Sequence, residues 1–158
     1  MNRLSRHAFV GLILSSVIFE FGCGASAKKP VEQLAPVTGR VTIQGTPHEG
    51  IQVIFTPQRD TKNSRGGTAV TDKDGKFEAR NYQNLVGLPP GDYAVTFSWM
   101  QTQDGLPVDS SRPPIPGVTA VEKIAPLWND PKKVSKHNFL QVSDGGKFDL
   151  EYKITTQK

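Results

Sequence analysis

The feature that most constrains the fold of this chain is a recurring alternation of apolar and other residues with a period of two. Successive side chains of a β-strand point to opposite faces, so the alternation predicts strands with one buried face. Beyond residue 36, no segment has the sustained apolar spacing of three and four residues that an amphipathic helix requires. The alternation is clearest in two segments. One face of 37–44 carries Val37, Gly39, Val41 and Ile43, and one face of 92–99 carries Tyr93, Val95, Phe97 and Trp99.

Turn-forming residues separate the alternating segments. The 158 residues include 15 glycines and 12 prolines, which favours short strands joined by many turns. About seven such strands predict an all-β fold, a single antiparallel β-sandwich over 37–158. The remaining strands are expected at 51–57, 68–71, 76–80, 137–143 and 147–155, and the last two form a C-terminal hairpin with Phe148, Leu150, Tyr152 and Ile154 on its inner face.

The alternation stops between Met100 and Lys136, and this segment holds half of all the prolines. We expect a long loop over 100–136, because the prolines cannot donate backbone hydrogen bonds to a sheet. Loops of this length in compact domains are often functional. Trp128 lies within it, and two interpretations stay open: it packs the loop onto the sandwich, or it is exposed and contacts a partner.

The N-terminus has the pattern of a signal peptide. Arg3 and Arg6 precede an apolar segment over 8–19, which is shorter than the roughly 20 residues that span a bilayer as a helix. A buried core helix is the alternative, but nothing nearby supplies a cap or a polar face. We therefore expect residues 1–22 to be a signal peptide and the protein to be exported.

Two cleavage sites follow the apolar segment. Residues 22–24, Gly-Cys-Gly, resemble a bacterial lipobox, in which Cys23 becomes the first residue and its thiol is lipidated. Glu20 departs from that pattern, where an aliphatic residue is usual. The alternative is cleavage after Ala27, which would release a soluble secreted or periplasmic chain that begins at Lys28. We favour lipidation, because the sole cysteine lies just past the apolar segment. Residues 23–36 are then a tether that anchors the domain to a membrane of the cell envelope.

The segment Asp72-Lys-Asp-Gly75 also has two interpretations. An Asp-Gly pair between two β-prone segments predicts a tight turn, since glycine accepts the positive φ that such turns need. The same residues open the calcium-loop pattern of an EF-hand. That pattern needs a glutamate at its twelfth position, which here is Gln83, and it needs flanking helices. The turn is therefore favoured, and no metal site is predicted.

The sequence predicts no catalytic residues and no cofactor. His48 and His137 could form a metal-dependent site with Asp72 or Asp74 only if folding brought them together, because no metalloprotease or nucleophile-elbow motif is present. The net charge of +4 is spread along the chain rather than clustered, so nucleic-acid binding is not expected. A lysine–asparagine crosslink is also disfavoured, since the first strand offers Arg40 and the last offers no asparagine.

Two motifs support a family resemblance over 37–99. They are Thr71-Asp-Lys-Asp-Gly-Lys-Phe77 and Leu88-Pro-Pro-Gly-Asp-Tyr-Ala-Val95, after the opening segment 37–42. In this order they resemble the transthyretin-like, carboxypeptidase regulatory-like domain, an Ig-like β-sandwich of exported bacterial proteins. The later segments with Trp128 and 148–150 resemble small bacterial lipoproteins. The resemblance implies an accessory or binding module at the cell surface, with a protein or glycan partner that it does not specify.

Overall fold

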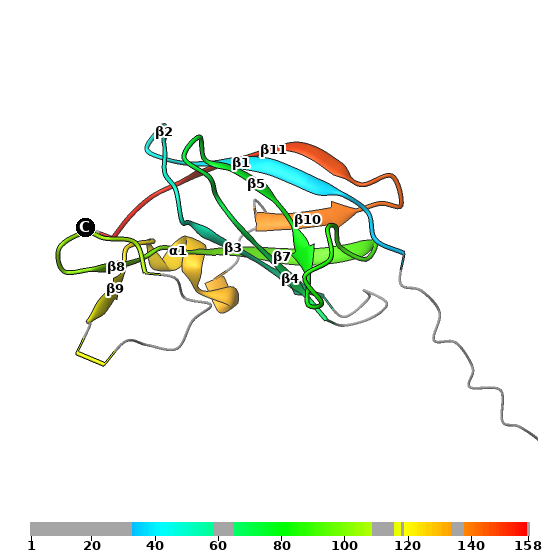
Figure 1. Cartoon of the computed structure of the whole chain (residues 1–158). Helices are drawn as coiled ribbons and strands as arrows, with labels where there is room; N and C mark the ends of the chain where they lie inside the picture. Colours follow the sequence, from blue (N-terminus) through cyan, green and yellow to red (C-terminus); the bar gives the residue numbers. More distant parts are fainter. Residues whose placement is uncertain (1–32, 59–64, 109–115, 118, 134–137, 158) are drawn as a thin grey trace, which may run out of the picture. The chain divides into compact units, whose positions relative to one another are not determined.

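Two β-sheets pack face to face in the part of the chain that the computed structural model describes (Figure 1). That part comprises residues 33–58, 65–108, 116–117, 119–133 and 138–157. The apolar side chains between the sheets form one core, to which residues of both sheets contribute. The predicted all-β fold is therefore confirmed.

The first sheet is built around β1 (Val37–Ile43). β1 pairs on one side with β11 (Lys147–Ile154) and on the other with β2 (Thr46–Pro47) and β5 (Lys76–Glu78). β2 and β5 run antiparallel to β1, but β11 runs parallel to it, which differs from the predicted antiparallel sandwich. The first and last long strands of the sandwich thus lie side by side.

The second sheet is antiparallel throughout. Its strand order is β10-β7-β3-β4-β6. β7 lies near the centre and is buried on both faces, since Ala94 and Thr96 are as inaccessible as the core residues beside them. The bounds are β3 (Gln52–Pro57), β4 (Gly67–Val70), β6 (Arg80–Asn81), β7 (Gly91–Ser98) and β10 (Phe139–Val142).

The segment predicted as one long loop contains short regular elements. β8 (Met100–Thr102) continues the chain beyond β7 and pairs with β9 (Ala120–Glu122) in a separate two-stranded sheet. A single helical turn, α1 (Pro126–Asn129), and a 3-10 turn, η1 (Pro131–Lys133), follow β9. The prolines are thus compatible with structure here, because two of them begin the helical turns, where the missing N–H needs no partner.

The period-two alternation correctly predicts the inner faces of most strands. The apolar residues expected to face inward on β1, β3, β5 and β7 are buried. Gly39, which shares the inner face of β1, is required there for space: a Cβ at this position would lie 2.6 Å from the carbonyl oxygen of Leu150 and 2.7 Å from the ring of Phe77. The glycine therefore lets β11 and the Phe77 ring close onto β1.

The predicted inner face of the last strand is wrong at Phe148, whose side chain is 54% exposed. The pairing of β1 with β11 shifts register between Val37 and Gly39, opposite Lys147 and Leu150. Asp149, in the extra stretch of β11, has φ of 54°. Such a bulge reverses the side-chain alternation on either side of it. Tyr152 and Ile154, which follow the bulge, are buried as predicted.

The predicted C-terminal hairpin opens just beyond its turn. Ser143 and Gly146 form a bridge, and the amide of Gly146 donates to the carbonyl of Ser143 at 2.9 Å. From there β10 pairs with β7 in the second sheet, while β11 pairs with β1 in the first. The two strands therefore join the sheets at one edge of the sandwich instead of pairing with each other.

The strand directions define two ends of the sandwich. The end at which β1 begins, here called the proximal end, carries Ala35–Pro36, the segment 82–90 and the turn 143–146. The opposite, distal end carries the segments 44–50, 71–75, 99–108 and 119–133 together with residues 155–157. Figure 1 shows β8, β9, α1 and the C-terminus at the distal end, away from the start of β1.

Candidate functional site

The distal end is organised around the carboxylate of Glu122. Oε1 accepts hydrogen bonds from the backbone N–H groups of Trp99 at 2.9 Å and Ile124 at 2.8 Å. Oε2 accepts from the Ser98 hydroxyl at 2.6 Å and from the side-chain amide of Asn129 at 3.1 Å. Hydrogen bonds to an ionised carboxylate are stronger than those between neutral groups. These four contacts therefore tie β9 and α1 to the end of β7.

Sequence reasoning missed Glu122. It lies in a three-residue strand inside the proline-rich segment, and its donors come from positions up to 24 residues away. The only sequence signal is an acidic residue two positions before Ile124, in a segment with few other acids. A solvent-exposed glutamate with no structural role would give the same sequence pattern.

Trp128 packs on this end of the core. Its ring meets that of Phe97 edge-on, with centroids 6.3 Å apart, and its indole N–H donates to the Thr155 hydroxyl at 3.2 Å. The side chain is half-buried against the core. These contacts favour the interpretation that Trp128 packs its segment onto the sandwich. A contact between its exposed part and a partner stays a prediction.

His48 packs against an aromatic side chain in a tilted arrangement. Its ring lies 4.7 Å from that of Trp99, and its backbone carbonyl accepts from the Thr71 hydroxyl at 2.7 Å. His137, which the disfavoured metal-dependent alternative would pair with His48, lies outside the described residues, as does Cys23. Among the residues that are described, no three His, Cys, Asp or Glu side chains gather closely enough to hold a metal ion.

Asp72 stabilises the turn that joins β4 to β5. Its carboxylate accepts from the backbone N–H groups of Asp74 and Lys76, both at 2.9 Å. Gly75 has φ of 74°, the conformation that the Asp-Gly pair predicted. The carboxylate that would open a calcium loop is therefore engaged with the backbone, as in an Asx turn.

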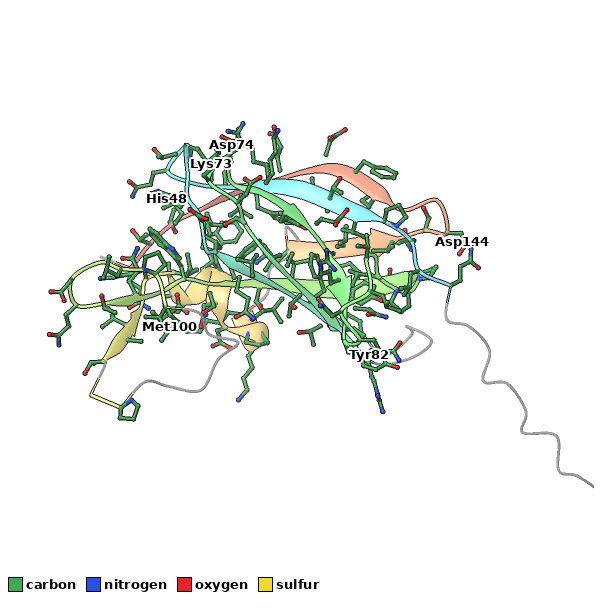
Figure 2. The ribbon with its side chains drawn as sticks, viewed as in Figure 1. His48, Lys73, Asp74, Tyr82, Met100 and Asp144 are labelled. Atoms are coloured by element: carbon green, nitrogen blue, oxygen red, sulfur yellow. The ribbon has the colours of Figure 1, made fainter. Side chains whose placement is uncertain are left out.

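The proximal end carries a turn with exposed apolar side chains, residues 82–86, here called the 82–86 turn. Tyr82, Leu85 and Val86 are 47%, 54% and 44% exposed. The buried side chain of Asn81 holds the backbone of the turn, because its Oδ1 accepts from the amides of Gln83 and Leu85 at 3.0 and 2.9 Å. Figure 2 shows Tyr82 and Asp144 in the right half of the view and His48 and Met100 in the left half.

Two arginines accompany the 82–86 turn. The guanidinium carbon of Arg65 lies 4.6 Å from the centre of the Tyr82 ring, within the range of a cation–π contact. Arg80 donates from Nη1 to the carbonyl of Asn84 at 3.1 Å, and its Nη2 lies 3.8 Å from the Glu78 carboxylate. The turn thus combines exposed apolar groups with positive charge.

Two hollows also occur on the described surface. The larger, about 930 Å³, lies over β1, β4, β5 and β11 and is lined by charges of both signs. The smaller, about 430 Å³, lies between the diverging strands β10 and β11, with Leu150 and Tyr152 in its lining. Neither hollow brings together charges of a single sign that would select a ligand.

Comparisons with known proteins add little. No family model and no curated protein matches the chain. A crystal structure of a 9R-lipoxygenase from Cyanothece PCC8801 is similar at 20% identity and a TM-score of 0.31. The match covers 82% of this chain, which spans 17% of the lipoxygenase chain. So low a TM-score carries no argument about this protein. Among the described residues, no helix has the length and apolar character needed to cross a membrane.

Proposed function

We propose that this protein is a non-catalytic binding or accessory module of the cell envelope, held at a membrane by lipid on Cys23. The signal-peptide pattern and the position of the sole cysteine support the anchor. The proposed family is the transthyretin-like, carboxypeptidase regulatory-like domain. Its two motifs correspond to well-formed local structures, the Asp72 turn and the segment that leads into β7.

The observation that carries the proposal is that the tether and the β8–β9 sheet lie at opposite ends of the sandwich. The tether enters the domain at the proximal end, where the backbone N–H of Lys147 donates to the carbonyl of Pro36 at 2.8 Å. The β8–β9 sheet and α1 lie at the distal end. An anchor at Cys23 would thus hold the proximal end toward the membrane and present the distal end to a partner.

The distal end has surface suited to a protein or glycan. Leu106, Val121 and Leu127 expose large parts of their side chains there, and Trp128 and His48 add partly exposed rings. Aromatic groups with one polar atom are enriched where proteins bind partners. The Glu122 contacts hold these segments in place, which reduces the entropy that binding would otherwise cost.

The contacts of the candidate catalytic groups support a binding role over a metal-dependent enzyme. The His48 ring packs on Trp99, and the Asp72 carboxylate accepts two backbone hydrogen bonds. The alternative to an anchored module is a soluble secreted or periplasmic sandwich, released by cleavage after Ala27. It would have the same distal surface but no attachment.

Membrane fractionation of cells that export the protein tests the anchor. The native chain should sediment with membranes and incorporate labelled fatty acid, while Cys23→Ser should release it into the soluble fraction. Ser26→Ala, three residues away, is the matched control and should stay with membranes. Equal solubility of the native chain and Cys23→Ser would contradict the anchor and support release.

Arrays of envelope proteins and glycans test the binding role. The native chain should bind, and Val121→Asp at the distal end should bind less. The control is Val70→Asp on β4, because Val70 is also an exposed valine on a strand. Equal loss in both variants, or no binding by the native chain, would argue against a distal binding surface.

A further inference from the structure

We propose that the 82–86 turn rests on the surface of an anionic phospholipid bilayer when the protein is anchored through Cys23. This contact depends on the proposed anchor and goes beyond it, because it fixes how the domain is oriented on the membrane. The turn would then be a second, weaker membrane contact beside the lipid.

The side chains of the turn suit the boundary between lipid headgroups and acyl chains. Tyr82, Leu85 and Val86 expose about half of their surface within five residues of sequence. Tyrosine is enriched at this boundary, because its ring is apolar and its hydroxyl is polar. The hydrogen bonds from Gln83 and Leu85 to the buried Asn81 fix the backbone, so the exposed side chains are presented without further ordering.

The charges beside the turn are complementary to anionic lipids. Arg65 lies over the Tyr82 ring, and Arg80 is bonded to the backbone of the turn at Asn84. Glu78 is the acidic group paired with Arg80, and at 3.8 Å it offsets part of that charge. Of these two arginines, Arg65 therefore carries more of the positive charge available to phosphate groups of the bilayer.

The length of the tether brings the turn close to the bilayer. Gln33, the first described residue, follows Cys23 by ten residues, which span at most about 35 Å when fully extended. Ala35 forms two backbone hydrogen bonds with Leu88, of 2.8 and 2.9 Å. The turn ends two residues before Leu88, so the tether enters the domain beside the turn. An anchored domain thus keeps the turn within reach of lipid.

Fluorescence quenching by brominated lipids tests the contact on the full chain, purified from membranes with its lipid and placed in anionic vesicles. Leu85→Trp puts a reporter in the turn. Leu106→Trp is the matched control, because Leu106 is a similarly exposed leucine at the distal end. The native Trp99 and Trp128 also lie at that end and give the background. Leu85→Trp should be quenched severalfold more than Leu106→Trp.

Two further arms test the lipid chemistry. In zwitterionic vesicles, the quenching of Leu85→Trp should fall toward the background. In anionic vesicles, the double variant Leu85→Trp/Arg65→Gln should show the same fall. Quenching that is unchanged in both arms would overturn the anionic preference. Equal quenching of Leu85→Trp and Leu106→Trp, or none in either, would overturn the contact.

The mass of the same purified chain separates this contact from the anchor. A chain that carries lipid but shows no quenching at residue 85 overturns the contact and leaves the anchor intact. If the membrane and soluble fractions of the cells yield only a chain that begins at Lys28 without lipid, the anchor is overturned, and the proposed contact with it.

Discussion

The Glu122 carboxylate accepts a hydrogen bond from the backbone N–H of Trp99 at 2.9 Å, at the point where β7 leaves the second sheet. Trp99 is followed at once by β8, which pairs with β9 and with no strand of the main sheets among the described residues. A two-stranded sheet is only marginally stable by itself. The contact between Glu122 and Trp99 therefore holds the β8–β9 sheet to the sandwich.

Loss of the Glu122 carboxylate should destabilise the distal end. Glu122→Ala removes the acceptor of two backbone N–H groups and of the Ser98 hydroxyl, whereas the Asn129 amide keeps its bond to the Phe97 carbonyl at 2.9 Å. A donor left unsatisfied in a buried site costs about 1–3 kcal/mol. Hydrogen exchange should show faster exchange at Trp99 and Ile124. The control Glu49→Ala, at an exposed position of the same end, should leave both rates unchanged. Unchanged exchange in Glu122→Ala would contradict this role.

The close packing of Leu150 and Phe77 around Gly39 gives a second prediction. Gly39→Ala should lower the free energy of unfolding by about 1–3 kcal/mol, because its Cβ would overlap Leu150 and Phe77. Gly145→Ala is the control, since no atom lies within 4 Å of a Cβ there. Denaturant titration of both variants measures the difference. Equal stability would show that β11 can shift away from β1 without loss.

The hydroxyl of Tyr93 makes a third prediction possible. It donates to the carbonyl of Pro89, four residues upstream, at 2.6 Å. This resembles the tyrosine corner of Greek-key sandwiches. Tyr93→Phe leaves a buried carbonyl without this donor and should cost about 1–3 kcal/mol in denaturant titrations. Tyr82→Phe removes an exposed hydroxyl and should have no measurable effect.

Tyr152 gives a prediction for high pH. Burial raises the pKa of Tyr152 from 10.0 to about 12. Between these values the unfolded chain loses the phenol proton and the folded chain keeps it, so unfolding becomes more favourable as pH rises. This rise in the pKa of Tyr152 corresponds to about 3 kcal/mol of stability, present below pH 10 and lost toward pH 12.

Denaturant titration across that pH range measures the loss. Tyr152→Phe should lack the loss of stability that the Tyr152 phenol causes between pH 10 and pH 12. Other groups that titrate in this range will change the stability of both proteins. Parallel stability curves for the native chain and Tyr152→Phe would contradict the raised pKa of Tyr152.

The alternation of side chains predicted most of the fold. Val37, Val41 and Ile43 are buried because β1 is regular, and the same holds for Tyr93, Val95 and Phe97 on β7. The alternation predicts which face of a strand is buried, but it does not predict which strand pairs with it. The parallel pairing of β11 with β1, and the separation of β10 from β11, depend on contacts distant in sequence.

Local irregularity accounts for the other differences. Phe148 is exposed because the backbone bulges at Asp149, and nothing in the Lys-Phe-Asp-Leu sequence marks such a bulge. The elements within 100–136 were hidden by its prolines, since β9 is held by its pairing with β8 and by the hydrogen bonds of Glu122, which join residues distant in sequence. The Trp128 packing was among the predicted alternatives because a large aromatic residue in a loop usually finds a core.

Intact-mass spectrometry of the protein purified from the membrane and soluble fractions of the same cells tests the central claim, the anchor at Cys23, most directly. We expect a chain that begins at Cys23 and carries the added mass of its lipid groups. An unlipidated chain that begins at Lys28 would contradict the anchor and the membrane contact of the 82–86 turn. The β-sandwich would stand in either case, because its described core begins at Ala35.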